Sequence, residues 1–233
     1  MRLHSVLQID PCATIAIIGA GGKTTALWRL AEERRAAGAL VTTSTHILQP
    51  SADACDTFCS PESWEALRTA CTPGRVTCAA YPDESGQCTG LPPDLFSAAL
   101  AHGLPILYEA DDTARQPAGL HPAGSPVLYP GTDTVLILAG LRALGRPVCE
   151  VCHRYTLSAH MAADPQRPFD TGDLLETIQD SIRACGMPPA RIRILVNQAD
   201  TPRRFSAAAP VLRQLRDAGY FVRPGCLRNP FWP

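Results

Sequence analysis

TIAIIGAGGKTT, residues 14–25, joins an apolar, β-branched run to a glycine cluster that is followed by Lys-Thr-Thr. Residues 26–31 then have the pattern of a helix, so the stretch is predicted to form a strand, a tight glycine turn and a helix N-terminus. Glycines allow backbone N–H groups to close on phosphate oxygens, and the helix dipole adds partial positive charge. The stretch therefore predicts a site for nucleotide phosphates.

The residues of this turn are the predicted nucleotide ligands: Gly19, Ala20, Gly21, Gly22, Lys23, Thr24 and Thr25. Lys23 is expected to reach the terminal phosphates and to act in catalysis, and the Thr24 hydroxyl to ligate Mg²⁺. Lys23 is the only lysine in the chain, whereas arginine is used everywhere else. Because a guanidinium cannot replace a compact ammonium at a phosphate loop, this solitary lysine supports the assignment.

The turn departs from the standard P-loop, because Ile17 stands where that motif has its first glycine. What remains is the shorter Gly-x-x-Gly-Lys-Thr form, which is also found in Mur-type ligases. A Rossmann dinucleotide turn is an alternative, since residues 19–21 supply Gly-x-Gly. It lacks the third glycine, where Thr24 stands, and the acidic residue expected after the second strand, where Thr42 and Thr43 stand. A chance glycine-rich turn is the remaining interpretation.

Length and composition suit one P-loop nucleotide-binding α/β domain over residues 1–233, with 45% apolar residues for its core. The net charge of −1 gives no electrostatic footprint for nucleic acid or an anionic membrane. No apolar run approaches the ~18 residues of a membrane span, and residues 1–5 lead into no signal-peptide core. We expect a cytoplasmic protein with no nucleic-acid or membrane partner.

Ten scattered cysteines are expected to be reduced thiols, several of them buried as small apolar side chains. Residues 149–153 match the C-x-x-C-H haem attachment pattern, but that chemistry requires an exported protein. A metal or redox pair at Cys149 and Cys152 has no second pair at zinc-site spacing. Two ordinary thiols are the preferred interpretation, and any chemistry at this pair stays open.

Strands and helices alternate along the chain, which predicts a P-loop NTPase-like α/β fold: a mostly parallel sheet with helices on both faces. The long segment 113–130 is expected to be an irregular and functional loop. Strands are predicted at 13–18, 40–43, 75–80, 105–108, 134–139, 192–196 and 220–222. Helices are predicted at 23–37, 61–67, 94–102, 173–185 and 207–218.

Ligands of such sheets bind at the carboxyl ends of the strands. Glu109 and Asp111 follow an apolar strand, where P-loop proteins place the carboxylate that holds Mg²⁺ or its waters. We assign Asp111, with Thr24, to the metal, and Glu109 to catalysis by positioning the attacking water. A solvated acidic loop is the alternative.

Residues 197–200, NQAD, resemble the Asn-Lys-x-Asp motif that reads guanine in GTPases, with Gln198 in place of the lysine. Asn197 and Asp200 are therefore candidate nucleotide ligands. A polar strand-to-helix turn is the alternative, so the nucleotide is ATP or GTP. Two further roles stay open: His46 as acid, base, ligand or merely hydrogen-bonded residue, and Arg154 as phosphate partner or structural ion pair.

In their order along the chain, these motifs resemble those of the YqeC family. The matching segments are 19–25, 41–46, 109–111, 125–128, 132–135, 140–145, 153–154 and 197–200. The chain departs from the family pattern at Asp112 and Thr113, where Gly and Ser are usual. It departs again near Gly119, where a lysine is usual, and at Ser125, where Glu is common. The resemblance implies a P-loop accessory protein that assists maturation of a selenium-dependent molybdenum hydroxylase.

Three functional hypotheses follow. The first is a Mg²⁺-dependent protein that binds and hydrolyses ATP or GTP, with a molybdenum hydroxylase or its cofactor-maturation proteins as the partner implied by the resemblance. The second is an ATP-dependent ligase or kinase for a small molecule, which needs a substrate pocket near residues 113–130. The third is a non-catalytic chaperone that uses nucleotide as a switch.

Overall fold

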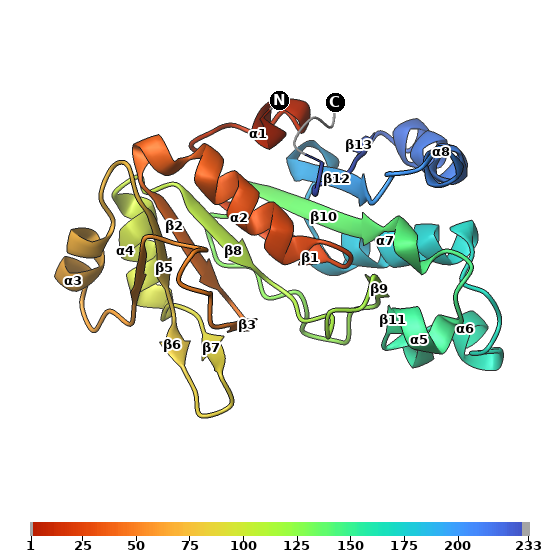
Figure 1. The fold of residues 1–233 in the computed structure, drawn as a ribbon, viewed down its shortest axis with the longest axis horizontal. Helices are drawn as coiled ribbons and strands as arrows, with labels where there is room; N and C mark the ends of the chain where they lie inside the picture. Colours follow the sequence, from red (N-terminus) through yellow and green to blue (C-terminus); the bar gives the residue numbers. More distant parts are fainter. Residues whose placement is uncertain (1, 230–233) are drawn as a thin grey trace.

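The computed structural model describes residues 2–229, and its largest sheet has eight strands in the order β13-β12-β10-β1-β8-β2-β5-β4 (Figure 1). Every neighbouring pair of strands in this sheet is parallel. The strands are β1 (Ile15–Gly19), β2 (Ala39–Thr43), β4 (Thr57–Cys59), β5 (Val76–Ala79), β8 (Ile106–Glu109), β10 (Thr134–Gly140), β12 (Ile192–Asn197) and β13 (Phe221–Pro224). Residues 1 and 230–233 of the single domain predicted over 1–233 lie outside the described residues.

Strand β1 lies inside the sheet, paired with β8 on one side and β10 on the other. All five of its residues are buried, which explains why its sequence is continuously apolar and does not alternate with polar residues. Strands of a parallel sheet are covered on both faces and therefore need apolar side chains on both. The glycine turn consequently emerges between the carboxyl ends of two neighbouring strands.

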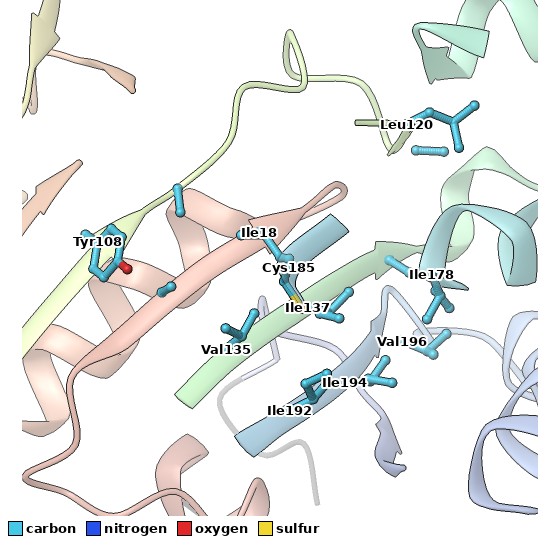
Figure 2. Packing of buried hydrophobic residues seen from close by; sticks show 14 of the residues in the cluster. Ile18, Tyr108, Leu120, Val135, Ile137, Ile178, Cys185, Ile192, Ile194 and Val196 are labelled. Carbon is cyan, nitrogen blue, oxygen red and sulfur yellow. The ribbon is translucent and has the colours of Figure 1, made fainter. Parts of the chain in front are cut away.

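Helices cover both faces of the sheet, as predicted. On one face, α1 (Leu3–Val6) and α2 (Lys23–Glu33) pack on alternate residues of β1, Ile15 and Ile17. Figure 1 shows α2 lying across this face. On the other face, Ala16 and Ile18 belong to the core that also contains residues of several helices, part of which is shown in Figure 2. The four longest of these helices are α3 (Trp64–Ala70), α4 (Pro93–Ala101), α7 (Thr171–Cys185) and α8 (Pro202–Asp217).

Helix ends follow local capping chemistry. Gly22, with φ of 142°, precedes α2, which stops at Glu33 and is followed by a separate 3-10 turn, Arg35–Ala37, so the helix predicted to run to residue 37 is shorter. Asp170 caps α7 in a reciprocal pair with Asp173. Helix α8 begins at Pro202, five residues before the predicted 207, because the Thr201 side chain caps it and proline suits the first helical position.

Several short elements were not predicted from the sequence. Strands β3 (His46–Leu48), β6 (Tyr81–Pro82) and β7 (Gln87–Thr89) form a small antiparallel ribbon, and β9 (Ala118–Gly119) pairs with β11 (Cys152–His153). Helices α5 (Val148–Val151) and α6 (Ala159–Ala163) are equally brief. Elements of two to five residues carry almost no periodic signal, because their partners are distant in the chain. Segment 113–130 is irregular apart from β9, as expected.

None of the helices within residues 2–229 combines the length and the apolar character needed to cross a membrane.

Candidate functional site

The turn after β1 requires glycine at two positions for steric reasons. Gly19 and Gly21 have φ of 83° and 81°, in the left-handed region that favours glycine. A Cβ on Gly19 would collide with the Leu138 carbonyl, and one on Gly21 with the backbone of Gly140. The turn thus packs backbone to backbone against β10, which fixes the position of residues 22–25.

The turn residues divide into two groups. Gly21 to Thr25 line a cleft of about 940 Å³ at the carboxyl ends of the strands. The amide of Gly19 instead donates to Asp111 Oδ2 (2.6 Å), and that of Ala20 to the Leu138 carbonyl (2.9 Å). The structure therefore brings five of the seven predicted phosphate ligands to the cleft, whereas Gly19 and Ala20 shape the turn.

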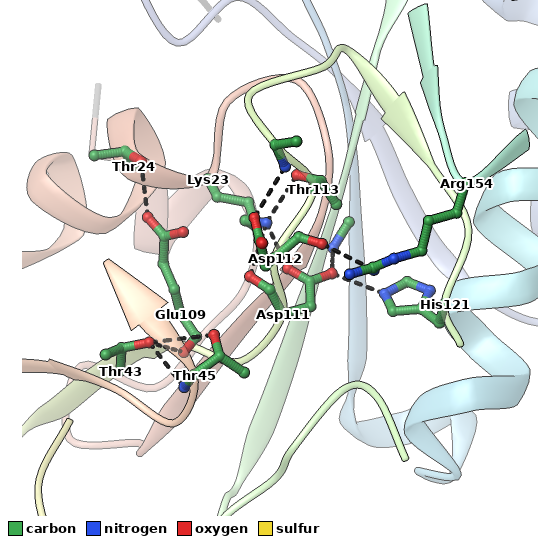
Figure 3. Close-up of polar contacts among 12 residues, drawn as sticks. Lys23, Thr24, Thr43, Thr45, Glu109, Asp111, Asp112, Thr113, His121 and Arg154 are labelled. Carbon is green, nitrogen blue, oxygen red and sulfur yellow. Dashed lines mark hydrogen bonds and ion pairs between the residues drawn. The ribbon is translucent and has the colours of Figure 1, made fainter. Parts of the chain in front are cut away.

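Lys23 is buried, with 7% of its surface exposed, yet it lines the cleft. Its ammonium lies 2.5 Å from Asp111 Oδ1 and donates to the Asp111 carbonyl and to Thr113 Oγ1, both at 3.0 Å. Figure 3 shows these contacts converging on the Lys23 ammonium. The sequence prediction assigned Lys23 to the terminal phosphates, and it included neither the ion pair with Asp111 nor the contact with Thr113.

Asp111 is part of a longer ionic chain. Its Oδ2 atom lies 2.7 Å from His121 Nε2, and the His121 Nδ1 atom lies 2.9 Å from Asp180 Oδ2 on α7. Burial alone would raise the pKa of Asp111, but Lys23 and His121 outweigh it and hold that pKa below its ordinary value. Burial also opposes a charged His121, yet the hydrogen bonds to Asp111 and Asp180 raise its pKa to about 9.

Thr24 contacts a different carboxylate from the one predicted. Its hydroxyl donates to Glu109 Oε1 at 2.8 Å (Figure 3), while the Asp111 oxygens contact Gly19, Lys23 and His121. Burial raises the pKa of Glu109, and the nearby Lys23 charge opposes that rise in part. The Thr24 hydroxyl therefore contacts Glu109 and not Asp111, the residue with which the sequence prediction pairs it as a metal ligand.

The hydroxyl and carboxylate of this pair suit magnesium, which prefers hard oxygen ligands. Within residues 2–229, no three His, Cys, Asp or Glu side chains are grouped so as to hold a metal ion. Mg²⁺ is usually bound by one or two carboxylates together with substrate phosphates and waters, so a small protein ligand set agrees with its chemistry. A metal that needs a full cage of protein side chains does not fit here.

The Asn197 side chain at the end of β12 forms hydrogen bonds with two other segments of the chain. Its Nδ2 atom donates to the Gly21 carbonyl at 2.7 Å, and its Oδ1 atom accepts from the Leu227 amide at 3.0 Å. Gln198, at φ of 68°, also donates to Gly21. Asp200 lines the cleft, where it pairs with Arg142 (3.1 Å) and Arg204 (2.6 Å). The NQAD segment therefore supports the glycine turn and places a carboxylate in the same cleft.

The hydroxyl-bearing residues at the end of β2 form hydrogen bonds that stabilise the fold. The hydroxyls of Thr42, Thr43 and Ser44 donate to backbone carbonyls of neighbouring segments. None of these three residues is among those that line the cleft, whereas His46 is. The structure thus gives these three hydroxyls tertiary hydrogen bonds within the fold.

Arg154 lies outside the residues that line the cleft. It has a left-handed backbone, with φ of 59°, and its guanidinium donates to the carbonyl of Asp112 at 3.1 Å. All ten cysteines are free thiols. Burial raises the pKa of Cys152 to about 12, which opposes reactivity at that member of the C-x-x-C pair.

Sequence reasoning missed His121 and Asp180. His121 falls in the irregular segment 113–130, and Asp180 on a helix whose sequence has an ordinary amphipathic pattern. Neither belongs to a motif, and they are 59 residues apart along the chain. Their meeting was decided by the packing of α7 against β10 and β9, which brings Asp180 to the residues that follow β9.

A parallel α/β sheet in which a glycine turn with Lys-Thr follows an inner strand, and carboxylates follow the adjacent strand, defines a P-loop NTPase-like protein. The family model described as YqeC protein matches residues 15–156, and the chain belongs to the YqeC family. This match includes Lys23, Thr24, Glu109, Asp111 and His121, and it ends before Asn197. No curated protein matches the chain.

Proposed function

We propose that this protein binds Mg²⁺-ATP or Mg²⁺-GTP and hydrolyses it. The observation that carries the proposal is the gathering of Lys23, Thr24 and Glu109 at one cleft beside the glycine turn. The sole lysine of the chain stands at the N-terminus of α2, where backbone amides and the helix dipole favour phosphate. This combination of parts is typical of phosphoryl-transfer sites.

Each residue has a role in this proposal. Lys23 and the amides of Gly21 to Thr25 hold the phosphates. The Thr24 hydroxyl and the Glu109 carboxylate hold Mg²⁺, which when bound neutralises charge on the phosphates. Asp111, the metal ligand expected from the sequence, is proposed to act as the counter-charge of Lys23.

We place the base of the nucleotide on the β12 side of the cleft, between Asn197 and Asp200. Calorimetric titration of Mg²⁺-ATP and Mg²⁺-GTP into the wild-type protein and Asp200→Ala tests this. If Asp200 accepts from guanine N1 and N2, the variant loses affinity for GTP and keeps its affinity for ATP. Absence of binding of either nucleotide to the wild type would refute the proposal as a whole.

The biological setting proposed for this activity is maturation of a selenium-dependent molybdenum hydroxylase, and its support is the family resemblance. The measurement that addresses it is nucleotide turnover with and without a purified molybdenum hydroxylase of this class. Stimulation by the hydroxylase supports the setting. Tight nucleotide binding with negligible turnover, even with the hydroxylase present, would favour the switch-like chaperone.

The extent of the cleft favours a second candidate, an ATP-dependent kinase or ligase. The lining runs from Asn197, at the end of β12, past β1 to His46, Leu48 and Gln87 on the β3–β7 ribbon. Strands β12 and β2 are four intervals apart in the sheet, which is roughly 19 Å at ~4.8 Å per interval. A nucleotide on the β12 side leaves the ribbon side for a small acceptor. Turnover that requires an added small molecule would distinguish this candidate from a simple NTPase.

A further inference from the structure

The Lys23 ammonium is already held inside the protein. It donates hydrogen bonds to the Asp111 carbonyl and to Thr113 Oγ1, both at 3.0 Å, and it forms an ion pair with Asp111 Oδ1 at 2.5 Å, an atom that accepts no hydrogen bond within the described residues. A phosphate in the cleft would therefore compete with Asp111 for the charge of Lys23. Phosphate binding at Lys23 is thus an exchange of ionic partners.

The exchange would leave Asp111 without its lysine. Its side chain is completely buried, and a buried carboxylate that loses its only cation is strongly destabilised. Asp111 has a second cationic partner, however, because His121 Nε2 lies 2.7 Å from its Oδ2 atom. The histidine side chain is 1% exposed, so water cannot take its place.

The geometry fixes the charge of His121. Its two ring nitrogens contact the carboxylates of Asp111 and Asp180, at 2.7 and 2.9 Å. Ionised carboxylates only accept hydrogen bonds, so both ring nitrogens carry hydrogen and the ring is an imidazolium. Asp180 also lies 3.7 Å from Arg183, so cations and anions alternate from Lys23 through Asp111, His121 and Asp180 to Arg183.

We propose that His121, held by Asp180, is a positioning residue of the nucleotide site, acting as the second cation of Asp111 so that Lys23 can pass from Asp111 to the terminal phosphates. This rests on the proposed nucleotide binding. When Lys23 turns to the phosphates, Asp111 and Asp180 remain balanced by His121 and Arg183. Asp111 stays in place and continues to hold the Gly19 amide, at 2.6 Å. The glycine turn thus keeps its shape while the lysine moves.

The test is a double-mutant cycle on the affinity for Mg²⁺-ATP and Mg²⁺-GTP, measured by calorimetry, with His121→Gln, Asp111→Asn and the double variant. His121→Gln leaves Lys23 as the only cation of Asp111 and should weaken binding by about tenfold. Asp111→Asn removes the competing charge and should tighten binding by about three- to tenfold. In the Asp111→Asn background, His121→Gln should have no further effect.

A purely structural role predicts the opposite pattern. His121→Gln would then weaken binding equally in both backgrounds, and that result would overturn the proposal. If His121→Gln fails to fold, Asp111→Asn alone decides: about tenfold weaker binding would identify Asp111 as a ligand of the metal or phosphates and overturn the exchange. If the wild type binds nucleotide and His121→Gln binds it with the same affinity, this inference is overturned and the proposed function stands. A wild type that binds neither nucleotide would overturn both.

Discussion

The Thr24 hydroxyl donates a hydrogen bond to Glu109 Oε1 across 2.8 Å, although the two residues are 85 positions apart in the chain. Thr24 is on the first turn of α2, and Glu109 is the last residue of β8, the strand paired with β1. The contact therefore joins the glycine turn to the neighbouring strand, at the proposed site of the metal. Substitution of Thr24 tests the contribution of its hydroxyl to this contact.

Thr24→Val should remove the dependence of nucleotide binding on Mg²⁺, because it deletes the hydroxyl and keeps the shape of the side chain. Thr24→Ser keeps the hydroxyl and is the matched control, so its affinity should stay close to that of the wild type. Calorimetry with Mg²⁺ and with EDTA measures the difference. Equal Mg²⁺ dependence in the valine and serine variants would remove Thr24 from the metal site.

Lys23→Ala should weaken nucleotide binding by about 10- to 100-fold, because a hydrogen bond to a charged group contributes ~1.5–3 kcal/mol. The fold should persist, since His121 remains as a cation beside Asp111. Arg213→Ala, at an exposed position on α8, removes the same charge and is the control. Equal affinity in the two variants would contradict a phosphate contact at Lys23.

Gly21→Ala should destabilise the protein far more than Gly145→Ala, although both glycines have φ of 81°. The shared left-handed backbone costs an alanine about 1–2 kcal/mol. A Cβ on Gly145 meets no atom within 4 Å, whereas one on Gly21 meets the backbone of Gly140, which should add about 1–3 kcal/mol. Free energies of unfolding from urea titrations should show this gap, and equal losses would contradict the tight packing of the turn.

Stability should fall with rising pH above neutrality, because the folded protein raises the pKa of His121 from 6.5 to about 9. A raised pKa means that the stabilisation is complete below pH 6.5 and is lost as the pH passes through about 9. At ~1.4 kcal/mol per pKa unit, the loss reaches up to about 3 kcal/mol. Urea unfolding of the wild type and His121→Gln between pH 6 and pH 10 measures it.

In His121→Gln the free energy of unfolding should vary much less over this range, since the titrating group is gone. His160→Gln removes a histidine whose side chain is 69% exposed, and it should retain the wild-type pH dependence. An identical pH dependence in the wild type and His121→Gln would show that the histidine does not carry the effect.

Much of the fold could be predicted because its signals are local. The apolar runs at 134–139 and 192–196 form strands as their sequences predict, and helix α7 was predicted from its amphipathic pattern. The glycines at 19 and 21 indicated a turn that only glycine can make. The short β3–β7 ribbon could not be predicted, because three residues at His46–Leu48 become a strand only through pairing with 87–89.

The candidate site likewise combines features that neighbouring residues encode with features that depend on long-range packing. By itself, the sequence determined that a solitary lysine would stand at the start of a helix behind a glycine turn, because strand, turn and helix are encoded by neighbouring residues. It placed Glu109 and Asp111 at the same edge of the sheet only through the rule that ligands bind at the carboxyl ends of parallel strands. Only the tertiary structure decided that Glu109 contacts Thr24, that Asp111 holds Lys23, and that His121 and Asp180 complete the ionic chain. Those pairings join side chains from different elements, and their distances depend on how helices and loops pack on the sheet.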